Sequence, residues 1–142
     1  MSSLSRSMFI SFLICTACGP DDKGVLKDEI LTLDLNYLNW ACDCANWATQ
    51  TDIHRYHDNK DDSLAIMSIF IEPASEGLTL PDTIGYLNDE VRFTGSFYEK
   101  RGFPEGYFSI ENPNKARVFR YTAYQVLSSN YEESKRLMEE QK

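Results

Sequence analysis

The chain has 142 residues, of which 42% are hydrophobic and 25% are charged, and this composition fits one globular domain and excludes a disordered or fibrous protein. Its formal net charge at pH 7 is −8. Nucleic-acid affinity comes from lysines and arginines that displace counterions along a basic face, so we expect neither nucleic acid nor a bare anionic lipid surface as a partner.

Residues 1–17 have the order of a secretory leader. Residues 1–7 carry one positive charge at Arg6, residues 8–14 are almost wholly apolar, and Thr16 and Ala17 are small. Charged, apolar and small segments in this order are typical of a signal peptide. The apolar run is much shorter than the roughly 20 residues of a permanent membrane-spanning helix, so we expect the leader to be removed.

The residues around Cys18 resemble the lipobox of bacterial lipoproteins, with Ala17 before the cleavage site and Cys18 after it. The sequence departs from that pattern at Cys15, which stands where leucine is usual. The resemblance covers residues 1–18 alone and implies a thioether-linked diacylglycerol on Cys18, commonly with a further acyl chain such as palmitate. Two or more acyl chains anchor a protein firmly, so we expect a protein held in the bacterial cell envelope, at the outer membrane. An ordinary secreted protein with a cysteine near its cleavage site is the alternative.

Residues 18–28 are predicted to form a flexible tether, because Gly19, Pro20 and Gly24 lie among polar residues. Within this segment, the pair Asp21-Asp22 resembles the short acidic export signal of Bacteroidota surface lipoproteins. That resemblance implies exposure at the cell surface, whereas an ordinary acidic linker leaves open which side of the membrane the protein faces.

Residues 29–128 are predicted to form a single β domain. The alternation of apolar side chains from Leu31 to Tyr37 predicts a strand, and the change of parity at Leu38 predicts that this strand is long and bent. The stretch 64–71 is apolar on both faces, which predicts a central strand.

Further patterns complete the predicted domain. A capping box at 49–52 predicts one short helix through about His57. Residues 91–98 alternate again, and Gly95 in their middle indicates a tight bend or a close approach of two backbones. The β-branched and aromatic stretch 116–127 predicts another long strand.

Long bent strands, one short helix and no βαβ rhythm favour a mainly β fold. We expect a small antiparallel barrel in the style of an OB-fold, with a β-sandwich or a half-barrel as the alternative. The charged residues 129–142 form either a loose helix or a C-terminal tail. Two short basic runs, at 100–101 and 115–117, fit solvated turns.

Cysteine and histidine gather in one stretch of the sequence. Once residues 1–17 are removed and Cys18 is acylated, the chain retains Cys42, Cys44, His54 and His57. This ligand set suits zinc or copper, although the Cys-x-Cys spacing is tighter than in common zinc sites. Two alternatives stay open: a disulfide, which requires a turn at Asp43 because residues two apart in a strand lie too far from each other, or two thiols packed in the core.

Aromatic residues cluster between positions 97 and 108, and in a small domain most of them are expected to fill the core. Tyr98 and Tyr107 are the candidates for exposed contacts with a ligand. No nucleophile with its base and no phosphate loop is present in the sequence. We therefore expect a protein without enzymatic activity or cofactor that binds or helps to assemble a protein or glycan partner; a zinc- or copper-binding lipoprotein is the alternative.

Overall fold

The structure is a computed structural model that describes residues 23–59 and 63–140. The expected leader, Cys18 and the acidic pair at 21–22 lie outside these residues. The strands are β1 (Leu31–Tyr37), β2 (Trp47–Thr49), β3 (Ile69–Pro73), β4 (Glu90–Phe97) and β5 (Arg117–Ser128). The helices are α1 (Gln50–Asn59), α2 (Ser63–Met67), the 3-10 turn η1 (Glu76–Leu78) and α3 (Tyr131–Glu140).

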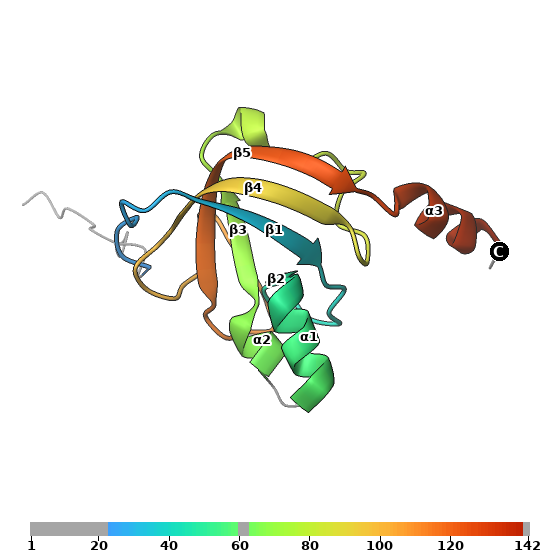
Figure 1. Ribbon diagram of the computed structural model, residues 1–142, viewed down its shortest axis with the longest axis horizontal. Helices are drawn as coiled ribbons and strands as arrows, with labels where there is room; N and C mark the ends of the chain where they lie inside the picture. Colours follow the sequence, from blue (N-terminus) through green and yellow to red (C-terminus); the bar gives the residue numbers. More distant parts are fainter. Residues whose placement is uncertain (1–22, 60–62, 141–142) are drawn as a thin grey trace, which may run out of the picture.

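The five strands close into a barrel in the order β1-β2-β3-β5-β4 (Figure 1). All neighbouring strands are antiparallel except β3 and β5, which run parallel. The small barrel predicted from the sequence is therefore confirmed, although it is mixed rather than wholly antiparallel. Because β1 pairs with both β2 and β4, the sheet has no open side of the kind that a sandwich or a half-barrel has.

The barrel is filled by side chains that point inward from every strand. This main core consists of buried apolar residues, namely Leu35, Trp47, Ile69, Val91, Phe93, Phe119 and Tyr121. Phe70 and Val118 are their strand neighbours, so they point to the outside of β3 and β5. They form a second, smaller buried cluster that Phe103 and Tyr107 cover. The segment between β4 and β5 is therefore packed onto the barrel wall.

The prediction of one long first strand was wrong. β1 ends at Tyr37, and Trp40 and Cys42 lie in the loop that leads to β2. Trp40 turns back toward the loop, because its indole Nε1 donates a hydrogen bond to the carbonyl oxygen of Ala45 at 2.8 Å. Alternating apolar residues after Tyr37 thus belong to a folded loop rather than to a continued strand.

The apolar stretch 64–71 is also not one strand, since α2 occupies its first part and β3 begins at Ile69. A short apolar run suits a buried helix as well as a buried strand. Ser68 ends the helix by donating from both its backbone N–H and its hydroxyl to the carbonyl oxygen of Leu64. The side chain of Ser68 therefore decides where helix gives way to strand.

Both predicted helical segments outside the barrel are present. The backbone N–H of Asp52 donates to Thr49 Oγ1 at 3.1 Å, and the Thr49 hydroxyl donates to Asp52 Oδ2 at 2.8 Å, so Thr49 caps the start of α1 as expected. At the other end of the chain, the charged C-terminal stretch forms α3, which buries none of its residues. Figure 1 shows α3 projecting away from the barrel, so its contribution to the core is small.

Gly95 is the point at which β4 comes closest to β5. The register between these strands shifts between Thr94 and Gly95. A Cβ atom at position 95 would lie 2.0 Å from the carbonyl oxygen of Arg120 and 2.7 Å from the Cα of Tyr121. The close backbone approach predicted from the sequence is confirmed, and the bulge beside it adds the curvature that a closed barrel needs.

We predict that Gly95→Ala lowers the free energy of unfolding by about 3 kcal/mol or more, because the new methyl group must displace the β5 backbone. Urea unfolding of the two proteins measures this difference. Gly77→Ala is the control, since a Cβ at Gly77 meets nothing within 4 Å. Equal stabilities of the two variants would contradict the close approach.

Candidate binding site on two barrel loops

Two loops that are distant in the sequence meet on one side of the barrel. They are the β1–β2 loop, residues 38–46, and the β4–β5 loop, residues 98–116. Asp43 joins them: its carbonyl oxygen accepts a hydrogen bond from the Tyr107 hydroxyl and its Oδ2 accepts one from Ser109 Oγ at 2.8 Å. Its backbone N–H donates to Glu111 Oε2 at 2.8 Å. Backbone and side-chain atoms of one residue thus hold both loops together.

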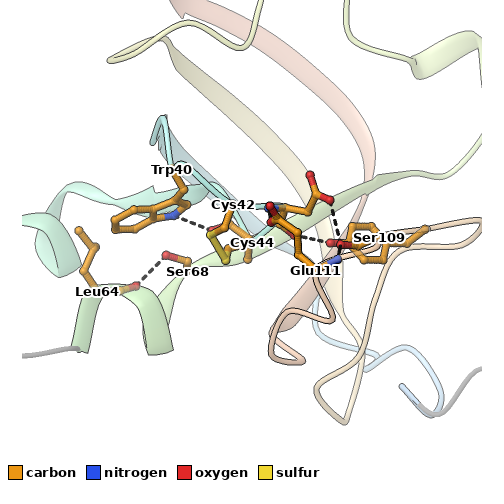
Figure 2. The surroundings of a disulfide bond; sticks show 10 residues. Trp40, Cys42, Cys44, Leu64, Ser68, Ser109 and Glu111 are labelled. Atoms are coloured by element: carbon orange, nitrogen blue, oxygen red, sulfur yellow. Dashed lines mark hydrogen bonds between the residues drawn. A yellow bond between two sulfur atoms is a disulfide. The ribbon is translucent and has the colours of Figure 1, made fainter.

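A disulfide between Cys42 and Cys44 shapes the β1–β2 loop at this point. Their Cα atoms are 5.2 Å apart, which requires the chain to bend at Asp43, as expected for this alternative. Figure 2 shows the disulfide between the ring of Trp40 on one side and Ser109 and Glu111 of the other loop. The cross-link therefore holds the bend at the residue that binds the β4–β5 loop.

The structure does not bring the four expected metal ligands together. His54 and His57 are exposed on α1, and both cysteine sulfurs are used by the disulfide. Within residues 23–59 and 63–140, no group of three or more histidine, cysteine, aspartate or glutamate side chains is placed to hold a metal ion. Zinc or copper binding stays a prediction that applies only to the reduced protein, whose thiolates are available as ligands.

Tyr107 is half-buried in the β4–β5 loop, and its contact with a ligand stays a prediction. Its ring stacks on Phe103, with ring centroids 4.9 Å apart and an angle of 3° between the planes. Both rings also contact Phe70 on the barrel wall. The exposed apolar residues of this loop are Phe108 at 83% and Ile110 at 88%, and sequence reasoning missed their exposure because burial cannot be assigned to neighbouring residues without the fold.

A buried carboxylate fixes the base of the same loop. The Glu72 side chain in β3 is 4% exposed and accepts hydrogen bonds from three directions: Lys23 Nζ at 2.5 Å, the Tyr98 hydroxyl at 2.6 Å and the backbone N–H of Glu105 at 2.8 Å. Arg120 Nε lies 3.8 Å from Glu72 Oε1. Tyr98 therefore uses its hydroxyl inside the domain, while its half-buried side chain also lines a surface pocket; its contact with a ligand stays a prediction.

Lys23 belongs to an N-terminal segment that is docked on the barrel. Residues 23–27 run beside residues 97–100, where Lys27 N–H donates to the Phe97 oxygen and Lys100 N–H donates to the Lys23 oxygen. The Glu99 N–H donates to Val25 in the same ladder. The described part of the segment expected to be a flexible tether is therefore an ordered extension beside β4. The only sign of this docking in the sequence was Glu72, a charged residue within an otherwise apolar strand.

Electrostatics favour the charged form of Glu72. Burial alone raises the pKa of this carboxyl group, but the hydrogen bonds from Lys23, Tyr98 and Glu105 outweigh burial and leave the pKa below its ordinary value. Burial and the neighbouring Glu72 carboxylate raise the pKa of Tyr98, so its hydroxyl keeps its proton and donates. A lowered pKa in the folded state means that the carboxylate stabilises the fold at neutral pH and that this contribution disappears as the pH falls through the lowered value.

A hollow adjoins the two loops where they approach α2. Its volume is about 610 Å³, and its lining includes Cys44 from one loop, Arg101 and Lys115 from the other, and Ile66 from α2. Concave surfaces with apolar walls and a few polar groups are the usual shape of ligand sites. The paired loops thus combine a hollow with two exposed apolar side chains.

No protein-family model, no curated protein and no solved structure matches the chain. The site is therefore defined by its own geometry: two loops joined at Asp43, fastened to the barrel by Glu72 and Phe70. Among the helices of residues 23–59 and 63–140, none has the length and apolar character needed to cross a bilayer.

We predict that Glu72→Gln lowers the free energy of unfolding by about 3–5 kcal/mol at neutral pH, because it leaves the buried Lys23 ammonium without its carboxylate. Urea unfolding measures this loss, and the difference from the native protein should shrink as the pH falls through the lowered pKa of Glu72. Asp34→Asn is the matched control, because Asp34 and Arg92 form a pair with side chains 40% and 46% exposed that is worth less than about 1 kcal/mol. Similar losses for both variants would show that the buried carboxylate contributes no more to stability than the exposed one.

Proposed function

We propose that this protein is a lipid-anchored lipoprotein of the bacterial outer membrane whose barrel is a non-catalytic module that binds or assembles a protein or glycan partner. The anchor is proposed from the lipobox-like residues at Ala17 and Cys18. The binding role is proposed from the two joined loops. The observation that carries it is the pair Phe108 and Ile110, exposed at 83% and 88% on a loop that is otherwise fastened at several points.

The position of these loops in the barrel supports a binding role. A closed five-stranded barrel with β3 parallel to β5 corresponds to an OB-like arrangement. OB-fold domains commonly bind ligands through the loops that join strands 1 to 2 and 4 to 5. In this protein these are the two loops that Asp43 connects, so an OB-like ligand surface would consist of them.

The chemistry of the loop surface indicates the class of partner. Two large exposed apolar side chains on one loop supply contact area that a partner can cover, and a pre-ordered loop loses little conformational entropy on binding. Asp43 and Glu111 place carboxylates at the same surface, which disfavours a phosphate backbone. A protein surface or a sugar face, on which an aromatic ring packs, fits better than a nucleic acid.

The lipid anchor is tested by the intact mass of the protein purified from its native membrane. We expect the mass of residues 18–142 plus a diacylglycerol and a further acyl chain, because the leader is removed and Cys18 is acylated. Cys18→Ala is the control and should release the protein from the membrane fraction. A retained leader or an unmodified Cys18 would contradict the anchor.

The binding surface is tested with a photo-crosslinking phenylalanine analogue placed at position 108 in intact cells. We expect one discrete adduct, sensitive to protease if the partner is a protein and to glycosidase if it is a glycan. We also expect Ile110→Ser to reduce its yield at least about tenfold, as for a central contact residue. The same analogue at Met138, which is 52% exposed on α3, is the control for an exposed apolar position outside the two joined loops. Equal adducts at both positions, or none at position 108, would rule out the loop surface.

A further inference from the structure

Four basic side chains gather beside the docked N-terminal segment. Lys27 comes from that segment, Lys100 and Arg101 begin the β4–β5 loop, and Arg117 begins β5. They line one surface pocket of about 280 Å³. This concentration of positive charge stands out in a chain with a net charge of −8.

The acidic groups around this pocket do not cancel its charge. Glu99 is the one carboxylate among the described residues that line it. Asp52 lies 3.7 Å from Arg117 on the other side. Two carboxylates thus face four cations, while Lys27, Lys100 and Arg101 are exposed to solvent. An anion is the ligand that this pocket suits.

The N-terminal segment decides which anion comes within reach. Cys18 precedes Lys23 by five residues, and five residues span at most about 18 Å. Lys23 itself is fastened by its ion pair to Glu72 and by the backbone hydrogen bond that its carbonyl oxygen accepts from Lys100. A domain of this size has a radius of gyration of about 13 Å, so it is roughly 34 Å across. Five residues cannot reach its far side, so a lipid on Cys18 holds the side of the barrel that carries Lys23 toward the bilayer.

We propose that the pocket lined by Lys27, Lys100, Arg101 and Arg117 binds the phosphate groups of anionic phospholipids and orients the barrel on the membrane. This inference rests on the proposed lipid anchor. An acyl anchor and a basic patch are the two signals that together give stable membrane association. Each lysine or arginine at an anionic surface strengthens the association about fivefold, and the rest of the acidic surface is repelled, so the patch sets one orientation.

The test uses the full native lipoprotein in vesicles of phosphatidylcholine, with or without phosphatidylglycerol. An uncharged acetylating reagent modifies accessible lysines, and mass spectrometry follows the rate at each position. We expect phosphatidylglycerol to slow acetylation of Lys27 and Lys100 by about fivefold or more and high salt to abolish this protection. Lys135 on the exposed helix α3 is the internal control and should react equally in both vesicles.

A pair of variants checks that the protection depends on the pocket. Arg101→Gln removes a pocket charge and should lower the protection of Lys27 and Lys100 about fivefold. Arg55→Gln, an equal loss of charge at an exposed position of α1, should leave it unchanged. Equal effects of the two substitutions would overturn a local site.

The remaining outcomes separate the possible failures. If inorganic phosphate protects the lysines equally well in phosphatidylcholine vesicles, the pocket binds small anions and the orientation proposal is wrong. If Cys18 carries lipid and the lysines react at the same rate in both vesicles, this inference fails while the proposed anchor stands. If intact mass shows Cys18 unmodified, the anchor and the inference built on it both fail.

Discussion

The buried carboxylate of Glu72 is the interaction on which the arrangement of this surface depends. It joins the N-terminal segment, through Lys23, to the start of the β4–β5 loop, through the Tyr98 hydroxyl, and to a later part of that loop, through the Glu105 N–H. A charge with 4% exposure of its side chain is tolerated in an interior only when its lone pairs are used. Any alternative docking of these segments would leave that charge without partners.

A second fastening acts near the middle of the same loop. The disulfide holds the bend at Asp43, and Asp43 binds Tyr107, Ser109 and Glu111. Between the two fastenings, Phe103 and Tyr107 stack over Phe70. The β4–β5 loop is thereby an ordered part of the barrel surface, and the exposure of Phe108 and Ile110 is a built feature rather than a consequence of a loose loop.

The distribution of charge changes what the overall charge implies. An acidic chain is repelled from phosphate groups on average, but electrostatic attraction at a surface depends on the local charge within about a Debye length. The fold gathers Lys27, Lys100 and Arg117, which lie far apart in the sequence, around one pocket. The proposed binding loops and the proposed lipid-facing pocket share the β4–β5 loop, so the orientation on the membrane would also decide how Phe108 is presented to a partner.

Local patterns in the sequence determined the features that depend on residues close together in the chain or on a single residue type. The capping box at Thr49 opens α1 because its hydrogen bond joins residues three apart. Gly95 marks a backbone contact because a glycine weakens the interior of a strand unless a neighbouring backbone occupies the space of its missing side chain. Apolar alternation was sufficient to predict a small barrel, since each strand had to bury one face.

Only the tertiary structure decided the features that depend on distant partners. The apolar stretch 64–71 became helix and strand where Ser68 bonds to Leu64, and the Tyr98 hydroxyl became a donor within the domain because Glu72 lies opposite it. Lys23 looked like part of a solvated tether because its partner is 49 residues away. The sequence likewise left three alternatives open for Cys42 and Cys44. In the structure the chain bends at Asp43, which also binds the opposite loop, and this bend brings the two cysteines to disulfide distance. Local spacing cannot encode such contacts, since the energy that fixes them comes from residues that meet only after the barrel closes.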